Sequence, residues 1–190
     1  MEIGSFVSLG ILTATLIYGI VIYNSLVNLK HGITKAWANI DVLLKQRHDE
    51  LPKLVDTCKR YMRHEQETLE QVMRARAAVS AAGARGDIGA LGSAENQLRL
   101  GLGSLFALAE AYPELKANET FRHLQQRISG LEESIAHRRE FYNESVNLNN
   151  VRIEQFPDLI LARMFGFRPG ELLEFSAEGV ADVNVGQLFS

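Results

Sequence analysis

The sequence has little of what builds a disulfide framework, a zinc cluster or a β-sheet. Its single cysteine, Cys58, excludes an intramolecular disulfide and any multi-cysteine zinc site. Aromatic residues make up 8% of the chain and β-branched runs are scarce, which disfavours an all-β fold. Only four prolines interrupt the chain, so long helices are permitted. The net charge of −3 gives no support to nucleic-acid binding, and no nucleic-acid partner is expected.

A long stretch near the N-terminus contains no charged residue. No charged residue occurs from Ile3 to Leu29. A helix needs about 20 apolar residues to cross a bilayer, and Phe6 to Leu26 meets that length. A cleavable signal peptide would need a basic start, whereas this chain starts Met1-Glu2. We therefore predict that residues 1–29 are a retained transmembrane anchor that contacts the lipid bilayer through residues 3–29; the alternative is a buried core helix.

The orientation of this anchor follows from the basic residues beside it. They all lie on its C-terminal side, namely Lys30, Lys35, Lys45 and Arg47. The positive-inside rule then places the N-terminus outside and the remainder in the cytoplasm. The opposite topology stays open. Within the anchor, Gly10 and Ala14 are a small-residue pair that allows two spans to pack closely.

From Ile33 onward the apolar residues follow the three–four alternation of packed helices. One row holds Ile33, Ile40, Leu54 and Tyr61, and the other holds Trp37, Leu44, Leu51 and Cys58. The pattern continues through Val72, Ala75 and Val79. It predicts a first helix that runs unbroken out of the bilayer, with a kink or short break near Asp49–Pro52.

Two more long helices and a short one follow. Gly83, Gly86, Gly89 and Gly92 indicate a turn, after which Leu91, Leu98, Leu102, Leu105 and Tyr112 share one seam. Asn118 is placed to cap a third helix that runs to about Gln155, and a short helix from Asp158 to Phe165 ends at Gly166. The predicted fold is all-α: an N-terminal transmembrane helix, then an antiparallel bundle of three long helices plus a short C-terminal helix.

The predicted domains are the anchor at 1–29, the bundle at 30–168 and a C-terminal tail at 169–190. The end of the tail, Ser176 to Ser190, alternates small, acidic and apolar residues. We expect it to be disordered, or to dock on the bundle or a partner.

Candidate catalytic residues are few. The five histidines are His31, His48, His64, His123 and His137. His64-Glu65 begins like a metalloprotease helix, but Thr68 stands where the second histidine is needed. Cys58 lies on a bundle seam and is interpreted as a small apolar filler. No catalytic, cofactor-binding or metal-binding residue is predicted, no cofactor is expected, and the chain is not expected to be an enzyme.

Four charged residues fall on helical seams: Arg47, Glu65, Glu95 and Arg138. Buried charges need partners, and such pairs can determine which helix faces meet. One hypothesis is that Arg47 or Arg138 pairs with an acid such as Asp49, Glu65 or Glu132 and sets the register of the bundle. The alternative is that these side chains reach water along their apolar stems.

An ordered set of short motifs resembles the LemA family over about residues 20–168. The motifs are Tyr23-Asn24-Ser25-Leu26-Val27, Ala36 to Asp49 with Pro52 and Leu54-Val55, Ala75-Arg76-Ala77, Tyr112-Pro113 to Phe121, Arg138-Arg139 with Tyr142-Asn143, Asn149, and Phe156-Pro157. Glu50 to Lys53 departs mildly from the family, which has Leu and Ile there more often. The resemblance implies a bacterial membrane-anchored helical bundle with no established catalytic activity, and it supplies no catalytic residues.

Together these features favour a non-enzymatic structural or interaction protein, anchored by a single span in the bacterial inner membrane. We expect it to form homo-oligomers, to bind protein partners still to be identified, and to organise or shape the membrane. The first alternative is a signalling or sensory bundle coupled to its span. A membrane-bound metal-dependent enzyme is the other alternative.

Overall fold

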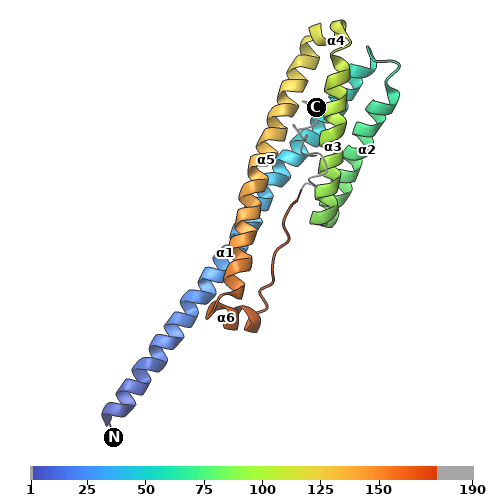
Figure 1. Cartoon of the computed structure of the whole chain (residues 1–190). Coiled ribbons are helices and arrows are strands. Elements are labelled where there is room, and N and C mark those ends of the chain that lie inside the picture. Colours follow the sequence, from blue (N-terminus) through green and yellow to red (C-terminus); the bar gives the residue numbers. More distant parts are fainter. Residues whose placement is uncertain (1, 175–190) are drawn as a thin grey trace, which may run out of the picture. The chain divides into compact units, whose positions relative to one another are not determined.

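The computed structural model describes residues 2–174, and within them every regular element is a helix (Figure 1). The helices are α1 (Glu2–Lys59), α2 (Gln66–Arg85), α3 (Ile88–Ala109), α4 (Pro113–Ala117), α5 (Glu119–Glu154) and α6 (Asp158–Met164). The predicted all-α class, with its long apolar first helix and short C-terminal helix, is confirmed. The predicted tail region 176–190 lies outside the described residues.

The chain divides into two compact units, and α1 and α5 each contribute to both. The first unit, called the anchor unit here, comprises residues up to Ile40 together with His137–Leu172. The second, called the bundle unit, comprises Asp41–Ala136 together with Leu173 and Glu174.

Four helical segments supply the apolar interior of the bundle unit. Leu51, Leu54 and Cys58 of α1 are fully buried, as the seam pattern predicts. The other segments contribute Leu69, Val72 and Val79 from α2, Leu91, Leu98 and Leu105 from α3, and Phe121, Leu124 and Ile128 from α5. Helices α2 and α3 approach closely at Gly101, where an added Cβ would lie 3.4 Å from Cγ2 of Val72.

The segment predicted as one long helix from Ile33 to Val79 is two helices. Helix α1 ends at Lys59, and the carbonyl of Cys58 accepts hydrogen bonds from the backbone N–H of Tyr61 and Met62 in a tight turn. Met62 is fully buried within this turn, so the apolar pattern continues across it. Of the kink or short break expected near Asp49–Pro52, the break is absent, since α1 is helical through Pro52.

The ends of the later helices follow the predicted chemistry. The side chain of Asn118 accepts a 3.0 Å hydrogen bond from the N–H of Phe121 at the start of α5. Of the four clustered glycines, only Gly86 lies in the turn between α2 and α3, with φ 66°, and Asp87 caps α3 at Ala90. Gly166, with φ 70°, follows the end of α6.

In the anchor unit, an extended segment after α6 packs along α5. Asn150 holds this segment through its amide, which accepts from the N–H of Gly170 at 2.8 Å and donates to the carbonyl of Gly170 at 3.0 Å. The Tyr142 hydroxyl donates to the carbonyl of Glu171 at 3.0 Å. Trp37 of α1 packs edge-on against the Tyr142 ring, with centroids 5.7 Å apart.

Candidate functional site

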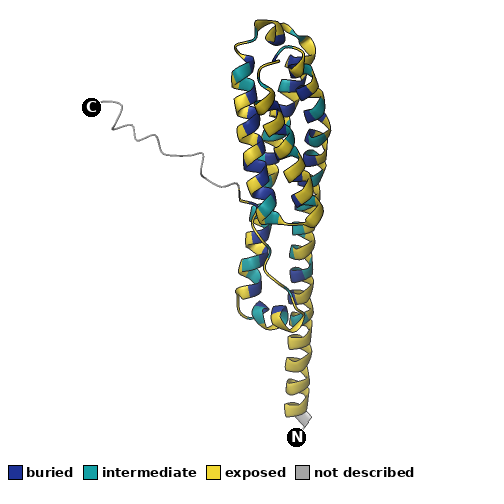
Figure 2. Cartoon of the chain, turned by 90° about the vertical axis from the view of Figure 1, so that its right-hand side faces the viewer, coloured by how far each residue is buried: buried dark blue, intermediate teal, exposed yellow. Residues whose placement is uncertain are grey.

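The N-terminal part of α1 is apolar on every side and uncovered (Figure 2). Its most apolar 18-residue window has a mean hydropathy of 2.1 and is 6% buried. Large side chains along it are more than half exposed, including Phe6, Leu12, Leu16 and Val21. By length and composition, α1 is able to cross a membrane. A helix that is apolar all round is typical of a membrane span or of the interior of a large protein.

Protein begins to cover α1 at Ile22, before the predicted anchor ends at residue 29. Ile22 and Leu26 are 4% and 0% exposed, and they form a cluster with Ile153 of α5 and Ala162 of α6. The Tyr23 ring packs edge-on against Phe165, with centroids 4.8 Å apart. The uncovered apolar surface therefore extends from residue 3 to residue 21, shorter than the predicted lipid contact of residues 3–29.

A buried ion cluster lies in the bundle unit. The guanidinium of Arg47, 1% exposed, contacts carboxylates of two other helices. Its Nη2 is 2.5 Å from Oε1 of Glu95 on α3, and its Nη1 is paired with Glu132 on α5. The Glu95 side chain is 2% exposed, whereas that of Glu132 is 24% exposed. One cation thus joins α1, α3 and α5.

Two opposing effects act on the pKa values of Arg47 and Glu95: burial disfavours the charged form of each group, and the attraction between opposite charges favours it. Burial raises the pKa of Glu95, because desolvation penalises its anion more than Arg47 stabilises it. Burial lowers the pKa of Arg47, but the two carboxylates outweigh it and leave that pKa raised. Arg47 therefore stays charged, and Nε of Arg47 has no hydrogen-bond partner among the described residues.

The structure confirms part of the register hypothesis. Arg47 pairs with Glu132, one of the acids named from the sequence, and also with Glu95, which was noted only as a seam residue. Arg138 is exposed. Glu65 instead accepts a 3.2 Å hydrogen bond from the hydroxyl of Tyr112. The spacing of residues in the sequence could not identify Glu95 as the partner of Arg47, because that pairing depends on how α3 packs on α1.

The candidate nucleophile and histidines do not converge. Burial raises the pKa of the Cys58 thiol to about 12, so it is protonated at neutral pH. His48 lies 2.6 Å from Nη2 of Arg76, and burial, then the Arg76 charge, lowers the pKa of His48. Within residues 2–174, no three His, Cys, Asp or Glu side chains are grouped as a metal site would need.

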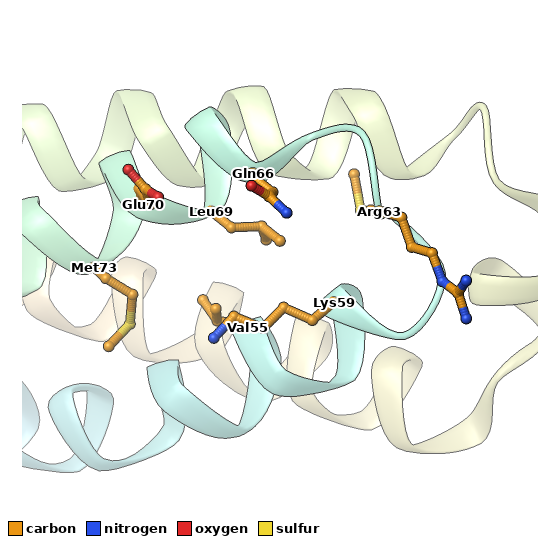
Figure 3. Close-up of a pocket in the computed structure, with 8 residues that line it drawn as sticks. Val55, Lys59, Arg63, Gln66, Leu69, Glu70 and Met73 are labelled. Carbon is orange, nitrogen blue, oxygen red and sulfur yellow. The ribbon is translucent and has the colours of Figure 1, made fainter.

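One cavity in the bundle unit and one in the anchor unit are large enough to hold a small molecule. One of about 580 Å³ lies in the bundle unit, where Val55 of α1 and Leu69 of α2 face each other while the Arg63 guanidinium points away (Figure 3). Its walls offer no converging set of polar groups of the kind that orients a substrate.

The other cavity, about 440 Å³, lies in the anchor unit beside the end of α6. It is lined by the aromatic rings of Tyr23 and Phe165 and by three basic residues, Lys30, His31 and Arg168. Basic side chains of this kind attract phosphate and carboxylate groups.

Comparison with known proteins gives both a family match and relatives. The model of the LemA family matches residues 36–186. Magnetosome proteins MamQ 1 and MamQ 2 of Paramagnetospirillum magneticum are each 34% identical over 107 residues, which is 55% of this chain and 39% of each relative. Magnetosome protein MamQ of Magnetospirillum gryphiswaldense is 32% identical over 88 residues, 46% of this chain and 32% of its own. The chain thus spans well under half the length of these relatives.

Proposed function

The chain belongs to the LemA family, and on that premise we propose that it is a non-enzymatic, membrane-anchored interaction protein that self-assembles at the bacterial inner membrane. The observation that carries this proposal is the uncovered apolar surface of α1 from residue 3 to residue 21. About 20 such residues match the thickness of a bilayer core. In water, a surface of this size would cost a large unfavourable hydration free energy.

The orientation proposed is N-terminus outside and bundle in the cytoplasm. Support comes from the positions of Lys30, Lys35 and Lys45, all on one side of the span. A protease-protection experiment on sealed cells tests it. A C-terminal epitope tag should survive external protease until the membrane is permeabilised, and cleavage in sealed cells would contradict the orientation.

We also propose that copies of the chain assemble with one another. Many anchors tied to one protein lattice could then organise or shape the membrane. The names of the relatives assign them to the magnetosome. In the span, Gly10 and Ala14 offer a contact between copies, and a Cβ added at Gly10 meets no atom within 4 Å. The surface at Gly10 is therefore available to a second span.

Mass measurement of the detergent-solubilised full chain tests assembly. Light scattering coupled to size exclusion should give a protein mass of two copies or more, and a monomer at every concentration would contradict the proposal. Gly10→Leu should lower the mass if the spans meet there. Ser8→Leu, on the opposite face of the helix from Gly10, is the matched control and should leave the mass unchanged.

A further inference from the structure

Helix α6 exposes large apolar side chains close to the uncovered surface of α1. Phe156, which precedes the helix, is 82% exposed, and Ile160, Met164 and Phe165 are 58%, 65% and 55% exposed. Ile160 and Met164 are four residues apart, so they share one face of the helix. The opposite face is covered, with Asp158 and Ala162 buried. A seven-residue helix thus presents an apolar face that no described residue covers.

Contacts within the anchor unit place α6 at the end of the bare part of α1. Leu161 lies 4.0 Å from the position of a Cβ at Gly19, and Ala162 packs with Ile22 and Leu26. Figures 1 and 2 both show α6 beside α1 at this point. From Ile3 to Ile22, α1 rises by about 29 Å, close to the roughly 30 Å of a bilayer core. A bilayer around that part of α1 would therefore have its surface at the level of α6.

The charges around α6 are of the sign that lipid headgroups attract. Asp158, the one acid of α6, is 4% exposed and pairs with Arg152, which leaves Arg163 as the exposed charge of the helix. The neighbouring cavity adds Lys30 and Arg168. An apolar face with basic residues at its edge is typical of segments that lie in the membrane interface.

We propose that α6, with Phe156 and Phe165, lies in the headgroup–acyl boundary of an anionic phospholipid bilayer and forms a second membrane contact beside the span. Ile20 and Val21 of α1 follow Gly19, which lies beside Leu161 of α6, and both are more than half exposed, as Ile160 and Met164 of α6 are. Exposed apolar side chains on both helices at this level favour lipid over a protein partner. This inference rests on the proposed membrane anchoring.

Depth measurements on the full chain in phosphatidylcholine–phosphatidylglycerol vesicles test the inference. An environment-sensitive fluorophore is attached to Ile160→Cys, to Leu12→Cys in the span, or to Leu148→Cys on α5. Leu148 is the matched control, because it is 54% exposed in the same unit and precedes by five residues Ile153, which packs with Ile22 and Leu26 where α1 is covered by protein. The native Cys58 is fully buried, and the unsubstituted chain measures its background labelling.

Three quenchers then report the position of each fluorophore. We expect the label at residue 160 to be quenched several-fold more by a shallow lipid nitroxide than by aqueous iodide. The label at 12 should respond most to a deep nitroxide, and the label at 148 to iodide alone.

The failures are distinguishable. If the label at 160 behaves like that at 148 while the label at 12 is quenched by lipid, α6 is not interfacial and the anchor stands. If all three respond to iodide alone, both proposals are wrong. If the label at 160 is shielded from iodide and from both nitroxides, a protein surface covers α6, and the inference is overturned.

Discussion

Two stretches of the same helix meet different surroundings. Residues 3–21 of α1 are apolar on all sides and exposed, whereas residues 40–58 alternate buried and exposed positions. In the second stretch Ile40, Leu51 and Cys58 are fully buried, while Val42 remains 54% exposed. The helix is continuous through both stretches, so backbone structure does not distinguish them.

The difference lies in how apolar residues are arranged around the helix. In the second stretch the apolar residues form a stripe on one side of the helix, and neighbouring helices pack on that side. In the first stretch apolar residues lie all round the helix, so packing on one side would leave the rest exposed. The first stretch is thus suited to lipid, as proposed above, and the second stretch is stabilised by packing. Two substitution pairs test this division, each comparing one stretch with the other, and a third pair tests the buried ion cluster of the second stretch.

The largest effect is expected from two arginines in the first stretch. Each arginine near the centre of a span costs about 2.5–3.5 kcal/mol of insertion free energy. The double variant Leu12→Arg/Leu16→Arg should therefore move from the membrane fraction to the soluble or degraded fraction, measured by cell fractionation and immunoblotting.

The matched control places the same two arginines on the second stretch. Val42 and Gln46 are exposed and four residues apart, as Leu12 and Leu16 are. Val42→Arg/Gln46→Arg should stay in the membrane fraction, since exposed substitutions usually change stability by less than about 0.5 kcal/mol. Equal behaviour of the two double variants would remove the distinction between the stretches.

A smaller effect is expected from Arg47→Met in the second stretch. Removal of one partner of a buried ion pair costs about 3–5 kcal/mol, here because Glu95 is left without its cation. The variant should lose stability against urea at neutral pH, followed by circular dichroism in detergent.

The loss caused by Arg47→Met should depend on pH. Burial already raises the pKa of Glu95, and it rises further without Arg47. A carboxyl whose pKa is raised on folding favours the folded state when protonated, and this stability is lost as pH rises through the folded value. The deficit should therefore shrink in mildly acidic buffer.

A second substitution checks the cause. Arg47→Met/Glu95→Gln removes the unpaired buried charge, and Glu132 can turn toward water because it is 24% exposed. The double variant should recover most of the loss at neutral pH. A double variant as unstable as the single one would indicate lost packing rather than lost charge pairing.

The smallest effects are expected from leucine-to-alanine substitutions. Leu51→Ala creates a cavity at a fully buried site and should cost about 2–5 kcal/mol. Leu16→Ala should leave the bundle unchanged, because Leu16 is 63% exposed.

Labelling of Cys58 measures this last pair. With a pKa near 12 and no exposure, the native thiol reacts only when the bundle opens. Leu51→Ala should speed labelling by about 30-fold or more, the equivalent of 2 kcal/mol. Leu16→Ala should not speed it, and equal acceleration by both would contradict the division.

Periodicity predicted the parts of the fold that depend on local sequence. The seams through Leu44, Leu51 and Cys58 are buried, and Asn118 caps α5 as its side-chain chemistry suggests. The apolar run before Lys30 identified the exposed surface of α1. These features are set within a few residues of the chain.

Features that depend on contacts between distant residues were missed. The turn after Lys59 contains neither glycine nor proline, and Met62 fills the core there, so the apolar pattern does not reveal it. Its position is supported by residues 47 and 57 positions away, through the Tyr112–Glu65 and Asn118–Tyr61 hydrogen bonds. The pairing of Arg47 with Glu95 likewise depends on the packing of α3.

Asn118 uses both ends of its amide, one as an acceptor and one as a donor. Its oxygen caps α5, and its Nδ2 donates to the hydroxyl of Tyr61 in the turn that follows α1. Aspartate would retain the cap and lose the donor, whereas serine offers one hydroxyl for both roles. One side chain thus links the start of α5, where it accepts from an N–H group, to the turn after α1, where it donates to a hydroxyl.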